Sequence, residues 1–209
     1  MFYNIIIDKT NMIINNRLGV TMKNIIKIVF GLFFIYCIVM GIYSASVYNS
    51  FVTANENIEN QFGIIESKLQ RRYDLIPNLV STVKGYMKHE DDVIKAVSEA
   101  NAALKNSYTT QDKIAASNRL DMALSRFIVL MNNYPDLKAD KHITALMDEL
   151  AGTENRISIE RDRYNQLVME YNKTIKHFPK NIIAAAFNFK EKPYFHADVN
   201  AKTAPKVEF

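Results

Sequence analysis

The longest uninterrupted apolar stretch of the chain runs from Ile25 to Tyr48. After Lys27 no charged residue occurs before Glu56. A helix of about 20 apolar residues crosses the hydrocarbon core of a bilayer, and a helix satisfies all of its own backbone hydrogen bonds there. The pattern therefore predicts one transmembrane helix over residues 25–48, with the lipid bilayer as the first partner of the chain.

Beyond Ser50 apolar residues recur every three or four positions, which is the spacing of one face of a helix. The first stripe should end near Asp74, because Pro77 lacks a backbone donor and disfavours helical geometry in the residue before it. A second helix is expected from Pro77, with loosening at Gly85, and a third between turns near residues 109 and 136. The stripe of the first helix consists of Phe51, Ile58, Phe62, Ile65 and Leu69.

A fourth periodic segment steps alternately by four and three residues, as in a helix of an antiparallel bundle. Two positions of this seam are charged, Glu154 and Arg161, and Pro179 should end the helix. The predicted fold class is all-α: an N-terminal transmembrane helix continues into an antiparallel bundle of about four long helices (49–179), followed by an irregular C-terminal tail (180–209). The seam consists of Ile143, Met147, Leu150, Glu154, Ile157, Arg161, Tyr164, Val168, Tyr171, Ile175 and Phe178.

Residues 1–24 show no clear period, and Met22-Lys23 resembles a second start ahead of the apolar run. We expect this leader to be disordered or not native, since chain termini are often disordered; an ordered amphipathic leader is the alternative. Cleavage of the apolar run as a signal peptide, at the small residues 44–46, is also open, but the run is longer than a usual signal core.

The charges that flank the apolar run predict its orientation. Basic residues dominate before it, whereas Glu56, Glu59 and Glu66 follow it before any Lys or Arg. Because basic flanks stay in the cytoplasm, we expect a single-pass protein of the bacterial inner membrane with its C-terminal domain outside the cytoplasm.

Composition narrows the classes of function. The net charge is +4 without a dense Lys/Arg block, so no nucleic-acid partner is expected. None of the four His residues forms a pair four positions apart, and neither a phosphate-binding Gly loop nor a nucleophile elbow occurs. No catalytic residue, cofactor or metal site is predicted, and the acidic run at 90–92 is interpreted as a solvated helix end.

Two charged groups in the bundle are candidate sites. If helices three and four turn near residue 136, Glu154 lies level with residue 118, so we predict a partly buried Glu154–Arg119 ion pair; exposure of Glu154 at the bundle edge is the alternative. Arg71, Arg72 and Asp74 are either a clasp at a helix end or a recognition patch far from the membrane.

The tail carries two further candidates. A bundle helix as long as the fourth would end near the lipid headgroups, where Ile182, Ile183, Phe187 and Phe189, flanked by lysines, suit an interfacial segment; the alternative is that they fold back onto the bundle. The C-terminal Val207 and Phe209 match the pattern of a free carboxylate that adds to a PDZ-type groove.

Several short motifs, in one order from residue 70 to the C-terminus, resemble the LemA family of bacterial membrane proteins, and the resemblance as a whole covers Met22 to the C-terminus. They are Gln-Arg-Arg-Tyr-Asp-Leu-Ile-Pro-Asn-Leu-Val (70–80), Tyr-Pro-Asp-Leu-Lys-Ala (134–139), Leu-Ala-Gly-Thr-Glu-Asn-Arg-Ile (150–157), Arg-Tyr-Asn (163–165), Tyr-Asn (171–172), Phe-Pro (178–179), Lys-Pro-Tyr-Phe (192–195) and the closing Ala-Pro-Lys-Val-Glu-Phe (204–209). The resemblance implies one membrane helix and a helical bundle, and it implies no particular reaction.

The function expected from these patterns is a membrane-anchored helical scaffold or interaction module at the cell envelope, without catalytic activity. The alternative is an accessory or regulatory subunit of an envelope protease or another membrane enzyme. Its protein partners are then unidentified envelope proteins, and the sequence leaves a homo-oligomer open.

Overall fold

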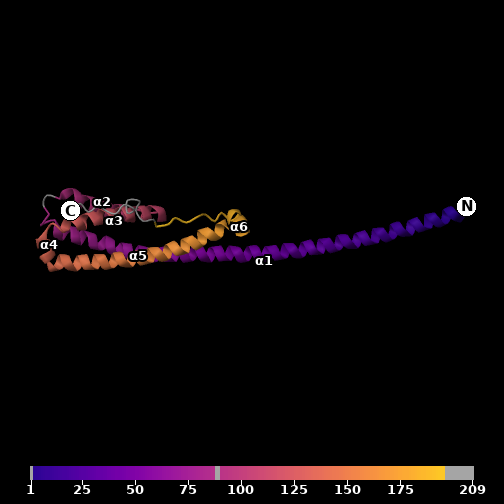
Figure 1. The fold of residues 1–209 in the computed structure, drawn as a ribbon, viewed down its shortest axis with the longest axis horizontal. Coiled ribbons are helices and arrows are strands. Elements are labelled where there is room, and N and C mark those ends of the chain that lie inside the picture. The colour runs from indigo at the N-terminus through magenta and orange to yellow at the C-terminus, as the bar shows by residue number, and fades with distance from the viewer. Residues whose placement is uncertain (1, 88–89, 196–209) are drawn as a thin grey trace, which may run out of the picture. The chain divides into compact units, whose positions relative to one another are not determined.

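A computed structural model of the chain describes residues 2–87 and 90–195 (Figure 1). Within these ranges all regular structure is helical, which confirms the predicted all-α class. The chain divides into two units, Met1–Ser50 and Phe51–Phe209. The helices are α1 (Phe2–Val83), α2 (Asp91–Lys105), α3 (Thr110–Met131), α4 (Pro135–Ala139), α5 (Lys141–Lys176) and α6 (Lys180–Ala186).

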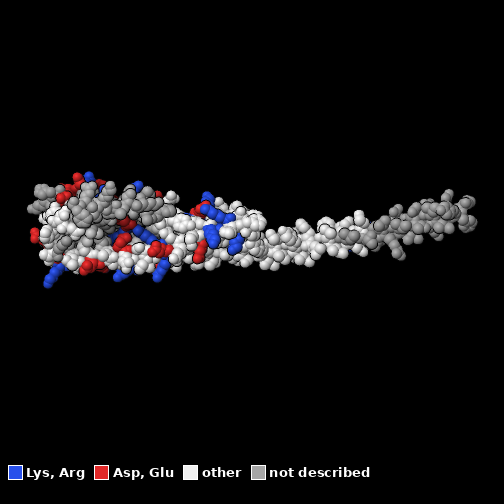
Figure 2. Space-filling model, in the orientation of Figure 1, with Lys and Arg blue, Asp and Glu red and all other residues white. Residues whose placement is uncertain are grey.

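The first unit holds the N-terminal part of α1 and the apolar run. Every side chain from Ile26 to Ile42 is exposed, and the visible face of this stretch carries no charge (Figure 2). Among the described residues, one helix is long and apolar enough to cross a membrane, and it contains this run. The predicted span therefore fits a single transmembrane anchor.

The helix α1 begins at Phe2 and so includes most of the leader predicted at residues 1–24. The structure places these residues in a helix rather than in an irregular segment. The leader contains no Pro and a single Gly, Gly19, and these are the two residue types that most disfavour a helix interior, so its sequence does not interrupt α1. Whether the leader is native stays a prediction.

The second unit is a bundle of four long helical segments that run up, down, up and down. The residue numbers of contacting pairs increase together in α1 and α3, from Glu66–Lys113 to Arg72–Asp121, so these two helices are parallel. The fifth helix is antiparallel to α1, because Phe51 meets Tyr171 while Arg71 meets Glu149. Figure 1 shows α5 beside the C-terminal part of α1 and α2 beside α3.

Two turns of the bundle lie near residues 109 and 136, as the sequence predicted, and the long helix that follows each of them is capped. Thr109 accepts a hydrogen bond from the Asp112 amide at the start of α3. Asp140 accepts hydrogen bonds from the amides of His142 and Ile143 at the start of α5. The hydrogen bond from His142 lowers the pKa of the Asp140 carboxyl, so the cap is ionised at neutral pH.

Pro77 does not end the first helix, which corrects the predicted stop near Asp74. The helix α1 continues through Pro77 to Val83, and the chain leaves the helix at Gly85, where loosening was expected. Pro77 has no N–H to offer the carbonyl of Tyr73 one turn earlier. The buried side chain of Asn101, in α2, donates a hydrogen bond of 3.2 Å to that carbonyl instead. A side chain from a neighbouring helix thus satisfies the group that Pro77 leaves unpaired.

We expect Asn101→Ala to lower the free energy of unfolding of the bundle by about 1–3 kcal/mol, because it leaves the Tyr73 carbonyl without a donor. Denaturant unfolding followed by circular dichroism measures the loss. In a Pro77→Ala background the new N–H of residue 77 can bond to the same carbonyl, so Asn101→Ala should cost less there. An equal loss in both backgrounds would refute this role for Asn101.

The predicted boundary of the bundle at residue 179 is too early. The helix α6 returns to the bundle. Residues 190–195, which we call the C-terminal strap, also lie against it. Asn172 accepts a hydrogen bond from the Lys192 amide and donates one to its carbonyl. Asn165 pairs in the same way with Phe195. An Asn amide carries one acceptor and two donors, so both asparagines bind the strap much as a neighbouring strand would.

Candidate functional site

A cluster of four charged side chains lies between α1, α3 and α5. The guanidinium of Arg72 is fully buried, and its Nη1 lies 2.5 Å from both Asp121 Oδ1 and Glu154 Oε2. Arg161 Nη1 donates to the second oxygen of Asp121 at 2.8 Å. Both arginines also donate to the buried hydroxyl oxygen of Ser117, at 2.8 Å from Arg72 and 2.6 Å from Arg161. Two positive and two negative charges thus balance inside the bundle.

The predicted ion pair of Glu154 named the wrong arginine. Glu154 pairs with Arg72, whereas Arg119 is exposed on α3. The buried face of α3 carries Ile114, Ser117, Leu120 and Leu124, and Arg119 lies off that face. The register estimate was close in level, but it ignored the direction in which residue 119 points.

Arg71, Arg72 and Asp74 do not form one patch. Arg72 is inside the cluster, while Arg71 and Asp74 are exposed. Arg71 pairs with Glu149 on α5, and Asp74 accepts a hydrogen bond from Gln70. Arg72 therefore fits the structural interpretation of this group, and the recognition role stays a prediction for the two exposed residues.

The cluster links three helices through its side chains. Asp121 uses both carboxylate oxygens for arginines, and Ser117 is surrounded by guanidinium donors rather than by a base. Each Nη atom of the two arginines donates at least one hydrogen bond, while the Nε atoms of Arg72 and Arg161 have no partner among the described residues. Within that part of the chain, no group of three or more His, Cys, Asp or Glu residues could hold a metal ion.

The strap closes one side of the cluster with aromatic rings. The guanidinium of Arg161 lies 5.1 Å from the ring centre of Phe195. That ring packs edge-on against Tyr164 at 5.4 Å and stacks with Phe62 at 6.2 Å. Burial raises the pKa of Tyr164 to about 12, so its hydroxyl remains protonated and donates to the Pro193 carbonyl.

On the other side of the cluster, a groove opens between α3 and α5. Two hollows of about 430 and 280 Å³ adjoin here, since Ile128 and Met147 line both. Their lining is mainly apolar, and its charged members are the carboxylates of Asp121, Glu154 and Asp148. We call these two hollows together the α3–α5 groove. The apolar lining consists of Leu124, Ile128, Met131, Leu137, Ile143, Met147, Leu150 and Ala151.

Neither the helical spacing of apolar residues nor the sequence motifs predicted this groove. Two apolar residues of its lining are not fully buried, Ile128 on α3 and Met147 on α5. Met147 was assigned to the core seam, yet it is only partly buried. An apolar residue at the edge of a helix stripe was the available signal.

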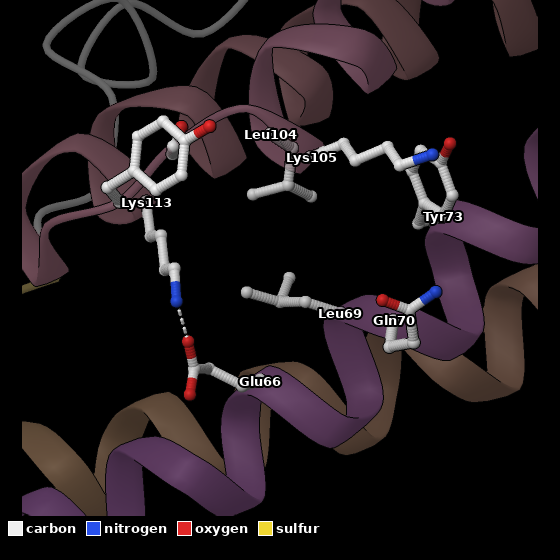
Figure 3. Close-up of a pocket in the computed structure, with 9 residues that line it drawn as sticks. Glu66, Leu69, Gln70, Tyr73, Leu104, Lys105 and Lys113 are labelled. Atoms are coloured by element: carbon white, nitrogen blue, oxygen red, sulfur yellow. Dashed lines mark hydrogen bonds and ion pairs between the residues drawn. The ribbon is translucent and has the colours of Figure 1, made fainter.

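A smaller hollow of about 230 Å³ lies between α1, α2 and the start of α3 (Figure 3). Leu69 and Leu104 face each other across it, and Lys113 points down to Glu66, with which it forms an ion pair. Lys105 lies 5.2 Å from the centre of the Tyr73 ring. Both lysines at this hollow already contact side chains of the bundle, so it is a weaker candidate than the α3–α5 groove.

The structure divides the predicted interfacial residues into two sets. Ile182 and Phe187 are exposed, whereas Ile183 and Phe189 are partly buried, and the Phe189 ring lies 5.1 Å from that of Phe51. Some of the patch thus folds back onto the bundle, as the alternative interpretation held. Val207 and Phe209, the predicted C-terminal ligand motif, lie outside the described residues.

Comparison with known proteins identifies the family of this architecture. The model of the LemA family matches residues 61–209, which include the cluster, the groove and the strap. The chain belongs to the LemA family. This confirms the resemblance seen in the sequence motifs.

Curated LemA-family relatives are similar over much of the chain. The magnetosome protein MamQ of Magnetospirillum gryphiswaldense is 25% identical over 175 residues, and the match covers 71% of this chain and 64% of the relative. MamQ 2 of Paramagnetospirillum magneticum is 24% identical over 174 residues, with the same coverage. The protein LemA of Metamycoplasma hominis is 23% identical over 150 residues, covering 71% of this chain and 68% of the relative. The match thus spans about 64% of the length of the MamQ relatives.

The LemA motifs of this chain coincide with the contacts just described. Arg72, in the first motif, is the centre of the ion-pair cluster. Glu154, in the third, reaches both Arg72 and the groove. Asn165, Asn172 and Phe195 fasten the strap. These residues of the LemA-like chain therefore hold a membrane-associated helical bundle in one register.

Proposed function

We propose that this protein is a membrane-anchored interaction module of the bacterial cell envelope, and that the α3–α5 groove receives an amphipathic helix from an envelope protein. The observation that carries the proposal is the groove itself, an apolar trough beside a rigid charge cluster. We infer a single-pass anchor in the inner membrane, with the bundle outside the cytoplasm, from the charges that flank the apolar run.

The dimensions of the groove suit a helix. Its lining on α5 extends from Ile143 to Ser158, which is about 22 Å of helix at 1.5 Å per residue. A partner helix of roughly 15 residues would lay apolar side chains, spaced by three and four positions, onto this trough. Helix-in-groove binding of this kind depends on apolar burial and uses charge for orientation.

The charge of the groove indicates which helix fits. All charged side chains of its lining are carboxylates. The Glu154 side chain is 43% exposed, so it can meet a cation of the partner while Arg72 holds it in place from below. Because Arg72 fixes this carboxylate, a basic partner residue finds it already oriented. The proposed occupant is therefore an amphipathic helix with a Lys or Arg at the level of Glu154.

A scaffold and a regulatory subunit would use this groove in the same manner. The buried Ser117 and the paired Asp121 favour a structural role for the cluster, so we propose that the protein itself is not an enzyme. If the partner is an envelope protease or another membrane enzyme, blocking the groove will alter the activity of that partner. If the partner has no activity, the scaffold function stands.

Filling the groove tests the proposal. Ala151 is exposed on the floor of the groove, and Ala151→Trp should exclude a partner helix without disturbing the core. We expect the wild-type protein, extracted from native membranes in a mild detergent, to migrate in native electrophoresis as a complex larger than the protomer. Ala151→Trp should shift it to the smaller species.

Ala145→Trp is the matched control, since Ala145 is also exposed on α5 but is not part of the groove lining. It should leave the complex intact. A complex that survives Ala151→Trp, or that is lost equally in both variants, would contradict binding through the groove. Mass spectrometry of the complex distinguishes a foreign partner from a second copy of this chain, and a second copy would also contradict the proposal.

A further inference from the structure

The helix α6 turns an apolar face away from the bundle. Ala184 is buried against the rest of the unit, whereas Ile182, Ala185 and Ala186 are exposed on the other side of the helix. Ile182 is 60% exposed, and the preceding Phe178 is 78% exposed. A helix at the surface of a soluble protein normally turns polar and charged residues outward. This face does not, so it suits an apolar or interfacial environment.

Two contacts beyond its C-terminal end hold α6 in place. The Phe189 ring, just after it, packs on Phe51 at 5.1 Å. The strap that follows is fastened to Asn172 by two hydrogen bonds of 2.9 Å. Both contacts lie within the second unit, so the outward face has a fixed orientation on the bundle.

The chain itself keeps α6 close to the membrane. Phe51, which contacts Phe189, follows Tyr48 by only three residues, and Tyr48 ends the apolar run. Three residues span at most about 11 Å, whatever the angle between the two units. The headgroup layer adds about 5–7 Å on each side of the hydrocarbon core. The residue that supports α6 therefore lies within reach of the bilayer surface.

Lysines flank the apolar face. Lys180 begins α6, and Lys190 follows it. Long lysine side chains can lie along apolar surface while their ammonium groups reach lipid phosphates. Lysines beside a membrane are attracted to anionic lipids. Apolar face and charge together resemble the pattern of segments that lie in the membrane interface.

We propose that α6 is a second membrane contact: Phe178 and Ile182 insert at the boundary between headgroups and acyl chains, with Lys180 and Lys190 among the phosphates. The bundle is then tied to the bilayer at two points, by the apolar run and by α6. Two contacts restrict the tilt of the bundle and fix the height at which the α3–α5 groove meets its partner. This proposal rests on α6 and the strap and is independent of what the groove binds.

The absence of tryptophan from the sequence makes a direct test possible. The full-length Ile182→Trp variant, reconstituted in vesicles of three parts phosphatidylcholine to one part phosphatidylglycerol, carries a single tryptophan in the outward face of α6. With lipids brominated near the start of the acyl chains, we expect a roughly twofold loss of its emission, because interfacial helices bury their apolar face about 5–10 Å deep. Its emission maximum should also lie to the blue of that of an exposed tryptophan.

Val129→Trp is the matched control. Val129 is 67% exposed on α3, close to the end of the bundle farthest along α1 from residue 51. Its emission should be the same in brominated and unbrominated vesicles. Equal emission of the Ile182→Trp variant in both lipids would overturn the proposal. A blue-shifted emission without quenching would also overturn it, because protein rather than lipid would then cover α6.

Discussion

Replacement of Arg72 by Met should lower the free energy of unfolding of the bundle by about 3–5 kcal/mol, since Glu154 then loses the arginine that it pairs with, and Asp121 keeps only Arg161. Met retains much of the volume of the aliphatic part of Arg, so the loss arises mainly from unpaired charge. Denaturant unfolding of the full chain in detergent, followed by circular dichroism, measures it. The apolar run stays helical in detergent, so the bundle transition is followed as the part of the helical signal that denaturant removes.

Arg71→Met is the adjacent control. The Arg71–Glu149 pair lies at the surface, with side chains 59% and 43% exposed, so its loss should change the free energy of unfolding by no more than about 1 kcal/mol. Adding Glu154→Gln to Arg72→Met removes the carboxylate that has lost its arginine and should recover part of the stability. Similar losses for Arg71→Met and Arg72→Met would show that the cluster does not stabilise the fold.

The second large effect is expected at the end of the strap. Phe195→Ala should cost about 3–5 kcal/mol, because it removes a buried ring that packs against both Phe62 and Tyr164. The same change withdraws the aromatic face that covers Arg161. Limited proteolysis offers a local measurement: cleavage within residues 190–195 should be faster in the variant than in the wild-type protein.

Phe178→Ala makes the same chemical change at an exposed position and should leave the free energy of unfolding within about 0.5 kcal/mol of the wild type. Similar stability of the Phe195→Ala and Phe178→Ala variants would mean that the strap adds nothing to the bundle. A loss in the Phe195→Ala variant alone would place residues 190–195 within the cooperative fold rather than in an irregular tail.

Most of the fold could be predicted from the helical spacing of apolar residues in the sequence. The apolar run, the turns near residues 109 and 136 and the long last helix follow from local periodicity, which reports each helix separately. The buried Arg72 occupies a position of the apolar stripe of α1, because it follows Leu69 by three positions and precedes Ile76 by four. An arginine in an apolar stripe, with Glu154 and Arg161 in another, was the available signal for a buried cluster.

The features that could not be predicted from the sequence depend on contacts between residues far apart in the chain. Pro77 looked like a helix end, because its local effect is to remove a donor, and nothing nearby shows that Asn101 replaces it. The strap looked irregular because its backbone hydrogen bonds go to the side chains of Asn165 and Asn172 rather than to a neighbouring strand. The groove is lined by residues from helices far apart in the chain, which periodicity along one helix does not encode.

The central claim is that the α3–α5 groove receives a basic amphipathic helix, and photo-crosslinking from inside the groove tests it most directly. A benzophenone amino acid at Ile128, in the groove, is compared in native membranes with the same group at its exposed neighbour Val129, which is not part of the groove lining. We predict that residue 128, and not residue 129, bonds to a peptide of another envelope protein with apolar residues three and four positions apart and a Lys or Arg. Ala151→Trp should abolish that product. A crosslinked peptide without this pattern, a peptide of this chain itself, or equal products from both positions would contradict the account.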